Sequence, residues 1–474
     1  MKILNISSEA VPFAKSGGLA DVVGALTPVL KKAGHDARIV MPAYNTKPQD
    51  AGEAVCSFEV PMLGRNEKVE IRAKKERGTV YYFVCHPYFC ERKGIYGDTS
   101  FEPYSDNFER FSMFCKASIL MCREMGWKPD VFHCHDWTAG LVPYFLDREG
   151  AFFKDCKSVF TIHNLAYQGT FPRMDWLLCA ERPNEKCFKD GRVNMLQTGL
   201  VFSDFITTVS PTYAKEIQTP QQGCGLEDIL IKRRKYLKGI VNGIDVKDWN
   251  PQKDALIPYH FTLKNLAGKA KLKAEIQKEF NLPVAPKVPV FAMISRLASQ
   301  KGFDALLPVL DRILKENRLQ FVIVGTGDSY LEKNLLEIAK FNENLSVNIM
   351  FSNKAAHLIE AGSDFFLMPS RYEPCGLNQL YSLRYGTIPI ARRTGGLADT
   401  IIDIGEFPRE GTGLLFDDLT SEEIERQVKR AVELYNRPGF ESMIYRAMNQ
   451  DFSWESSAEE YLSVYKKITA KKRS

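Results

Sequence analysis

The chain has 474 residues, which is about three times the commonest domain size and favours two domains over one large core. Hydrophobic residues make up 45% of the chain and charged residues 26%, a composition that excludes the disordered, collagen-like and membrane-spanning classes. A formal net charge of +5 is small for this length, so a nucleic-acid scaffold is excluded and any basic site must be local.

Short apolar runs bounded by turn residues alternate with longer amphipathic stretches, which is the pattern of βα units. The expected strands span residues 2–7, 37–42, 80–86, 130–136, 158–164, 205–210, 238–244, 288–295, 320–325, 347–351, 364–370 and 387–393. Most are unbroken apolar runs, as expected of strands that are covered on both faces. The sequence therefore predicts the α/β class with two parallel sheets.

Helices are expected over residues 20–34, 265–280 and 453–474. A turn at Asn242–Asp245 is followed by a stretch rich in proline, lysine and asparagine, so we expect a domain boundary near residues 245–250.

The eleven cysteines form no CxxC pair, which favours free thiols in a reducing compartment over disulfides or a zinc site. The N-terminal apolar stretch is too short for a secretory signal, and we expect a cytoplasmic protein.

A glycine-containing loop, Lys15–Asp21, follows the first expected strand and opens the first helix. Gly17 and Gly18 allow the backbone to approach a ligand, the helix start offers N–H groups and Lys15 supplies a cation. The loop fits an anion such as a phosphate. It also fits an ordinary strand-to-helix turn, because the pattern is not GxGxxG.

Three further candidates follow strands in the second half of the chain. Arg296 and Lys301 lie between a strand and a helix, where basic side chains are also often simply solvated. Glu373 precedes a turn at a helix start, where a carboxylate can bind sugar hydroxyls or cap the helix. The segment Thr394–Ile401 repeats the GGLAD pattern of the first loop at another expected helix start.

The HCHDW segment carries His133 and His135 on one face of an expected strand, followed by Asp136. No second cluster of ligands accompanies them, so we expect no metal site there. Asp136 is interpreted instead as a ligand-binding residue at the carboxyl end of a strand, and His163 ends the next strand. No DxD pair occurs anywhere in the chain, so a departing diphosphate would have to be neutralised by Lys15, Arg296, Lys301 and helix N-termini.

The segments SSEAVPFAKSGGLADVVGAL, TIHNLAYQG, GIVNGID, SRLASQKGFD, PSRYEPCGLNQLYSLRYGTIPIARRTGGLADT and DFSWESSAEEY together resemble the bacterial glycogen synthases and plant starch synthases. They occur in that family's order across nearly the whole chain. The resemblance implies the GT-B fold, with two Rossmann-like domains facing a central cleft. It places residues 1–245, joined by the C-terminal helix 455–474, in the first domain and residues 246–454 in the second.

The resemblance also implies retaining transfer of glucose from ADP-glucose to the non-reducing 4-OH of an α-1,4-glucan, without metal or cofactor. The catalytic set that it implies is His163, Arg296, Lys301 and Glu373, with Arg296 and Lys301 on the diphosphate and Glu373 on the glucose. The substrate-binding set that it implies is Lys15, Gly18, Asp21, Tyr96 on the acceptor side, Asp136, Asn164, Asn242, Phe351, Cys375, Gly376, Leu377, Thr394, Gly395 and Gly396. Expected partners are the donor and a glycogen or maltooligosaccharide acceptor, with no nucleic acid and no membrane.

The closest alternative is the same fold with UDP-glucose or another acceptor. Met350 and Phe351 stand where the family usually has Gly-Tyr, which keeps an aromatic face for the base but leaves base selectivity open. A nicotinamide-dependent oxidoreductase is disfavoured because no GxGxxG with a following acidic residue is present. A silent glucan-binding protein is disfavoured because every charged position of the motifs is filled. We further expect that replacing Lys301 lowers the catalytic rate by orders of magnitude without unfolding the protein.

Overall fold

In the computed structural model, which describes residues 1–98 and 102–470, the chain forms two compact units. The first comprises Met1–Gly243 together with the chain from Trp454 onward, and the second comprises Ile244–Ser453. The C-terminal segment thus packs with the N-terminal half of the sequence.

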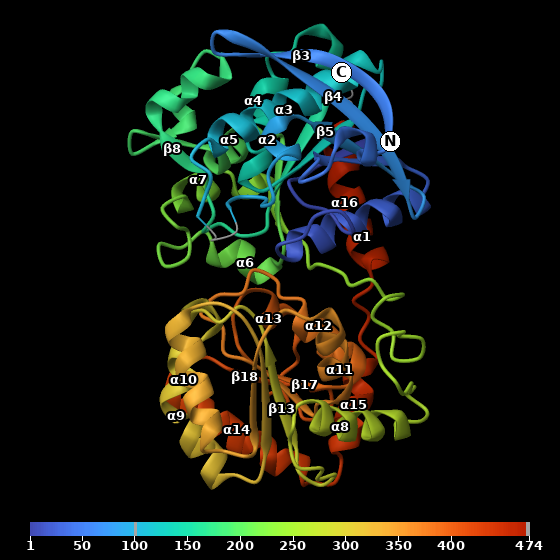
Figure 1. Cartoon of the computed structure of the whole chain (residues 1–474), viewed down its shortest axis with the longest axis vertical. Helices are drawn as coiled ribbons and strands as arrows, with labels where there is room; N and C mark the ends of the chain where they lie inside the picture. The colour runs from blue at the N-terminus through green and yellow to red at the C-terminus, as the bar shows by residue number, and fades with distance from the viewer. Residues whose placement is uncertain (99–101, 471–474) are drawn as a thin grey trace. The chain divides into compact units, whose positions relative to one another are not determined.

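The first unit is built on a nine-stranded sheet with the order β12-β11-β7-β6-β1-β2-β5-β4-β3 (Figure 1). Seven strands run parallel: β1 (Lys2–Ile6), β2 (Asp36–Pro42), β5 (Thr79–Cys85), β6 (Val131–His135), β7 (Lys157–Ile162), β11 (Phe205–Thr208) and β12 (Leu237–Gly239). The strand order reverses direction at β1, which pairs with β2 on one side and β6 on the other. Loops that leave β1 and β6 therefore flank a topological switch point.

The prediction of two parallel sheets is confirmed, but one edge of the first sheet carries an antiparallel hairpin that was not predicted. The hairpin β3 (Glu53–Met62) and β4 (Arg65–Glu76) is antiparallel and joins the sheet through β5. Its residues alternate between exposed and buried, so it lacks the unbroken apolar runs from which the other strands were predicted. A second small antiparallel sheet, which was also not predicted, contains β8 (Thr170–Pro172), β10 (Arg192–Asn194) and β9 (Phe188–Lys189).

Helices cover the first unit's sheet. They are α1 (Gly18–Lys32), α2 (Pro87–Cys90), α3 (Asn107–Glu124), α4 (Val142–Leu146), α5 (Met195–Phe202), α6 (Pro211–Glu216), α7 (Glu227–Lys232) and α16 (Trp454–Thr469), with 3-10 turns η1 (Pro48–Ala51), η2 (Trp137–Ala139), η3 (Ala151–Phe153), η4 (Arg173–Cys179), η5 (Glu185–Cys187) and η6 (Arg234–Tyr236). Helix α1 buries Val22, Leu26 and Leu30, whose spacing of four residues forms one apolar stripe. Tyr461 and Tyr465 of α16 lie in the same core, so the last helix is part of this unit.

The second unit contains a six-stranded parallel sheet with the order β15-β14-β13-β16-β17-β18. Its strands are β13 (Val290–Ile294), β14 (Gln320–Gly325), β15 (Leu345–Ile349), β16 (Phe365–Met368), β17 (Ile388–Arg392) and β18 (Leu414–Phe416). When these six strands are numbered 1 to 6 along the chain, their order in the sheet is 3-2-1-4-5-6, which is the Rossmann arrangement. The switch point of this sheet lies between β13 and β16.

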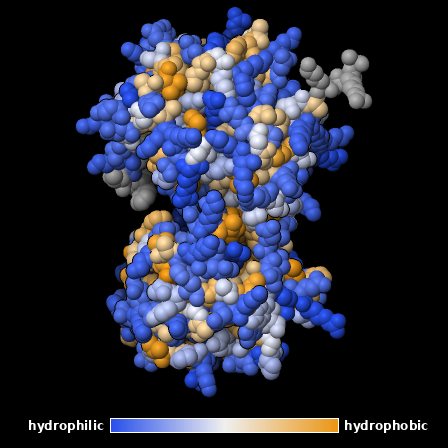
Figure 2. Space-filling model, turned by 90° about the vertical axis from the view of Figure 1, so that its right-hand side faces the viewer, coloured by the Kyte–Doolittle hydropathy of each residue, from blue (hydrophilic) through white to orange (hydrophobic). Residues whose placement is uncertain are grey.

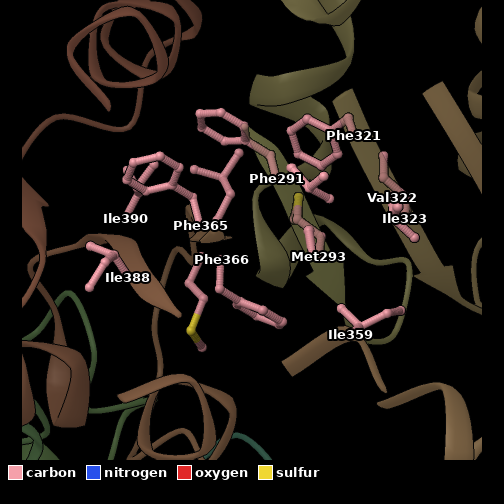
Figure 3. Packing of buried hydrophobic residues seen from close by; sticks show 14 of the residues in the cluster. Phe291, Met293, Phe321, Val322, Ile323, Ile359, Phe365, Phe366, Ile388 and Ile390 are labelled. Atoms are coloured by element: carbon pink, nitrogen blue, oxygen red, sulfur yellow. The ribbon is translucent and has the colours of Figure 1, made fainter. Parts of the chain in front are cut away.

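Helices lie on both faces of the second sheet, with α9, α10 and α14 on one side and α8, α11, α12 and α15 on the other (Figure 1). Their bounds are α8 (Ala267–Glu279), α9 (Phe303–Glu316), α10 (Ser329–Lys340), α11 (Asn353–Gly362), α12 (Asn378–Tyr385), α13 (Gly395–Thr400), α14 (Ser421–Tyr435) and α15 (Phe440–Met448), with the 3-10 turn η7 (Ser299–Lys301) before α9. Aromatic rings of adjacent strands meet in the core, where the ring of Phe291 lies 4.9 Å from that of Phe365 and 6.1 Å from that of Phe321 (Figure 3).

On the face shown in Figure 2, hydrophilic residues dominate and hydrophobic residues occur in small scattered groups. Among the described residues, no helix has the combination of length and apolar character that crossing a bilayer requires. All eleven cysteines are free thiols, as their spacing predicted.

Candidate functional site

The switch point of the second unit collects three loops that leave neighbouring strands. They follow β13 (residues 295–302), β16 (residues 369–377) and β17 (residues 393–394). Parallel strands deliver such loops to the same edge of a sheet, which is where ligands bind in open α/β folds. The predicted residues Arg296, Lys301, Glu373 and Gly395 lie on or directly after these loops.

Glycines allow the three loops to pack backbone against backbone. Gly302 has φ of +78°, and a Cβ there would lie 1.9 Å from the carbonyl oxygen of Pro369. Gly395 has φ of +44°, and its Cβ would lie 1.9 Å from the carbonyl oxygen of Glu373. A side chain at either position would collide with the neighbouring loop, so the glycines hold the loops in one arrangement.

Hydrogen bonds tie the same loops together. The N–H of Arg371 donates to the carbonyl of Gln300 at 2.8 Å, and the N–H of Gly396 donates to the carbonyl of Glu373 at 3.1 Å. The amide of Asn378, at the start of α12, donates to the carbonyl of Ile294 at 2.6 Å. Neither Gln300 nor Asn378 was predicted as a site residue, because each contacts backbone carbonyl or N–H groups of another loop, and sequence spacing does not reveal such contacts.

Lys301 and Glu373 form the charged centre of these loops. The Nζ of Lys301 lies 2.5 Å from Oε2 of Glu373, and the two side chains are 19% and 8% exposed. The hydroxyl of Ser370 donates to the same carboxylate oxygen at 3.0 Å. Glu373 is therefore an ionic partner of Lys301 and not simply a helix cap, which was the alternative from sequence. An ammonium group has three donors, so Lys301 can bind this carboxylate and a second anion together.

The other predicted residues of this unit border the pair. Arg296 contacts the side-chain oxygen of Gln300 at 3.1 Å. Thr394 precedes α13, Gly376 has φ of +73°, and Leu377 precedes α12 after the buried Cys375. Phe351 follows the edge strand β15 and is 88% exposed, so its ring presents a free aromatic face.

In the first unit, the loop after β1 binds a carboxylate of its own. Glu9, which is 2% exposed, accepts hydrogen bonds from the Ser16 hydroxyl at 2.7 Å and the Gly17 N–H at 3.3 Å, and it also bonds the Ser16 N–H and the Tyr96 hydroxyl. The anion that these loop amides bind in the structure is therefore Glu9. Glu9 was not predicted as a site residue, because its only signal in the sequence is an acidic side chain three positions after a buried strand.

The remaining charges of this loop lie at the start of α1. Lys15 pairs with Asp21 at 2.8 Å, and burial raises the pKa of Asp21 while Lys15 opposes the shift. Gly18 is the first residue of the helix. The hydroxyl of Tyr96 also lies 2.9 Å from that of Ser8, so this tyrosine is anchored to the loop after β1.

Asp136 follows β6 with a left-handed backbone, at φ of 55°. Its Oδ1 accepts the N–H of His163 at 2.7 Å, which joins the ends of β6 and β7. Burial raises the pKa of Asp136 to about 7, although the N–H groups of His163 and Asn164 act against this shift. The buried Oδ1 of Asn242 has no hydrogen-bond partner among the described residues, which fits a ligand contact.

His133 and His135 lie on β6 and are fully buried. Tyr465 contacts Nδ1 of His133 at 2.8 Å, and Asn5 and His163 contact the two nitrogens of His135. Their ring nitrogens are thus engaged by protein groups.

Known families match both units. The family described as starch synthase catalytic domain matches residues 2–232, and the family described as glycosyl transferases group 1 matches residues 274–449. The chain is 44% identical to glycogen synthase 2 of Geobacter sulfurreducens over 98% of each sequence, and 44% identical to glycogen synthase of Treponema denticola over the full length of both.

Solved structures give a similar result. The catalytic domain of starch synthase IV from Arabidopsis thaliana, bound to ADP and acarbose, superposes with a TM-score of 0.91 at 31% identity and covers 99% of both chains. The sucrose-phosphate synthase of Thermosynechococcus elongatus shares the fold with a TM-score of 0.64 at 17% identity, over 98% of both chains.

Proposed function

Because the chain belongs to the glycogen and starch synthase family and is a glucosyltransferase with the GT-B fold, we propose that it transfers glucose from ADP-glucose to the non-reducing 4-OH of an α-1,4-glucan. The observation that carries this proposal is the Lys301–Glu373 pair, held among interlocked loops at the switch point of the second unit. The starch synthase that this chain resembles was solved with ADP and with acarbose, an oligosaccharide analogue, which supports an adenine nucleotide and a glucan as ligands.

In the second unit, Arg296 and Lys301 would neutralise the diphosphate and Glu373 would hold the transferred glucose. Backbone groups of residues 375–377 and 394–396 would line the donor, and the exposed ring of Phe351 would stack on the base. Two cations beside one diphosphate offset its charge without a divalent ion. This arrangement agrees with the absence of a DxD pair from the sequence.

In the first unit, Lys15 and Gly18 would also contact the diphosphate, with Asp21 setting the position of the lysine. Asp136, His163, Asn164 and Asn242 would contact the sugar. Tyr96 would serve the acceptor side with its ring, because its hydroxyl is bound to Glu9 and Ser8.

The reaction would proceed on one face of the sugar. The bond between C1 and the diphosphate oxygen breaks as an oxocarbenium-like sugar forms, and the acceptor O4 bonds to C1 from the same side. The proton of the acceptor hydroxyl passes to an oxygen of the departing ADP, so atoms and charge balance. No carboxylate nucleophile is needed, in contrast to retaining hydrolases that use two carboxylates.

Donor competition tests this function. With a maltooligosaccharide acceptor, ADP-glucose should be turned over in preference to UDP-glucose, and EDTA should leave the rate unchanged. The measurement is nucleoside diphosphate release together with chain elongation. Turnover of UDP-glucose alone would overturn the donor assignment, and loss of activity with EDTA would overturn the metal-free mechanism.

The raised pKa of Asp136 predicts a pH dependence. We expect kcat/KM to rise between about pH 6 and pH 8, because the ionised carboxylate is the better acceptor for the His163 N–H and for sugar hydroxyls. The folded state holds this proton more tightly than the unfolded chain does, so the carboxyl's contribution to stability falls as pH rises from about 4 to about 7.

Asp136→Asn is the matched variant for this dependence, because the amide keeps the shape and cannot ionise. Its rate should be low and should not rise over the same range, and its melting temperature should lose the corresponding pH dependence. A wild-type profile that is flat or falls through pH 7 would contradict the expectation. An unchanged rise in Asp136→Asn would assign the titration to another group.

A further inference from the structure

A chain of polar side chains runs through the core of the first unit from α1 to His163. It contains Thr27 of α1, Asn5 of β1 and His135 of β6, all fully buried, and ends at the half-buried His163 after β7. Because Thr27, Asn5 and His135 are closed off from water, each must satisfy its hydrogen bonds within the protein. The direction of every hydrogen bond can therefore be worked out from one end.

The starting point is a carbonyl group, which can only accept. The hydroxyl of Thr27 lies 2.8 Å from the carbonyl oxygen of Val23 and must donate its proton there. The oxygen of Thr27 is then left to accept, and it accepts from the amide nitrogen of Asn5 at 3.1 Å. This bond fixes the orientation of the Asn5 amide and turns its oxygen toward His135.

The amide oxygen of Asn5 lies 3.3 Å from Nε2 of His135 and can only accept, so Nε2 carries the proton. A neutral imidazole has a single N–H, so Nδ1 of His135 carries a lone pair. That nitrogen lies 3.0 Å from Nε2 of His163, which must then be the donor. The remaining nitrogen of His163, Nδ1, is thereby left with a lone pair.

Both imidazoles are neutral near pH 7. Burial lowers the pKa of His163 to about 3, and it lowers the pKa of His135 well below its ordinary value. The neighbouring His133, whose pKa is also lowered to about 3 by burial, belongs to a separate set of contacts with Thr161 and Tyr465. No charged imidazole therefore interrupts the chain from Thr27 to His163.

We propose that Thr27, Asn5 and His135 are positioning residues that fix His163 as the Nε2–H tautomer, so that its Nδ1 accepts a hydrogen bond from a hydroxyl of the transferred glucose. Among the described residues, the one ring hydrogen bond of His163 is the bond between its Nε2 and His135, and its Nδ1 makes none. The glucose hydroxyl then donates its proton to Nδ1 of His163, and the oxygen of that hydroxyl can accept hydrogen bonds from other groups. The inference rests on the proposed contact between His163 and the sugar.

The tautomer can be read directly in the full-length protein. With 15N-labelled histidine, long-range correlations between ring protons and ring nitrogens show which nitrogen carries the proton, and His163→Ala assigns the signals. We expect the Nε2–H form at both His135 and His163 in the wild type. The Nδ1–H form at His163 would overturn the proposal without any variant or activity measurement.

Thr27→Val removes the hydroxyl while preserving shape, and Thr27→Ser restores it. The valine variant should show a mixture of tautomers at His163 and a fall in kcat/KM of about tenfold, the size expected for one lost hydrogen bond. The serine variant should recover both. A rate loss in Thr27→Val with the His163 tautomer unchanged would show a merely structural role and overturn the proposal.

Thr207→Val is the matched control. Thr207 is equally buried, and its hydroxyl lies 2.6 Å from that of Thr161 in the contacts that lead to His133. Its loss should perturb the signals of His133 and leave the rate unchanged, and an equal rate loss would overturn the proposal. Full activity of His163→Ala would overturn the proposed contact between His163 and the sugar. That failure can be distinguished from a failure of the tautomer assignment, because the tautomer is measured without turnover.

Discussion

Replacing Lys301 with alanine should reduce kcat by about 10³-fold. At an effective dielectric near 20, a cation about 4 Å from a phosphate oxygen contributes about 4 kcal/mol. If this contribution is felt mainly as the diphosphate departs, it corresponds to about three orders of magnitude in rate. Initial rates with ADP-glucose and a maltooligosaccharide measure the loss.

The same substitution should also lower the melting temperature, which the sequence alone did not predict. Lys301 is the ionic partner of Glu373, whose side chain is 8% exposed, and its removal leaves that carboxylate with the Ser370 hydroxyl. Leaving a buried polar group without its partner costs about 1–3 kcal/mol. For a unit of the size of Ile244–Ser453 we expect a fall of about 2–10 °C.

A double variant separates the two effects. In Lys301→Met with Glu373→Gln the uncompensated charge is gone, so the melting temperature should return toward that of the wild type while the rate stays low. Lys278→Ala is the control, since that lysine forms an exposed pair with Glu275 in the same unit and should affect neither property. Recovery of the rate in the double variant would make the role of Lys301 structural.

The parallel strands could be predicted from the sequence because most are continuous apolar runs. The order of the strands in the two sheets could not be predicted. That Lys301 and Glu373 meet across 72 residues follows from β13 and β16 lying side by side at the switch point. The family resemblance implied that both residues bind ligands, but it gave no reason for them to bind each other. The hairpin β3–β4 was missed because its polar and apolar residues alternate and one face is exposed.

In the candidate site too, contacts between residues far apart in the sequence could not be predicted from local patterns. The KSGG loop was correctly interpreted as a group of backbone donors, but its bound anion comes from within the chain, since Glu9 lies only seven residues before Ser16. The metal alternative for His133 and His135 was set aside because the sequence shows no second cluster of ligands, and the absence of a metal there stays a prediction. Their hydrogen bonds to Tyr465 and Asn5 depend on residues 332 and 130 positions away, which no local pattern encodes.

The second large effect is expected from Gly395→Ala. A Cβ at this position would lie 1.9 Å from the carbonyl oxygen of Glu373, and the neighbour is backbone that cannot rotate away. The φ of +44° adds the left-handed strain of a non-glycine residue, about 1–2 kcal/mol. The loop that carries Glu373 must shift, and a displacement of about 1 Å at a reacting centre costs about 10²-fold in rate.

Gly439→Ala distinguishes that displacement from backbone strain. Gly439 lies in the same unit with φ of +100°, but a Cβ there meets no atom within 4 Å. Both variants should therefore melt at lower temperatures, whereas only Gly395→Ala should lose kcat/KM when the two are assayed at a temperature at which both remain folded. An equal loss of rate in both variants would assign the effect to general destabilisation. A wild-type rate in Gly395→Ala would show that catalysis does not require the close contact between the loops at this switch point.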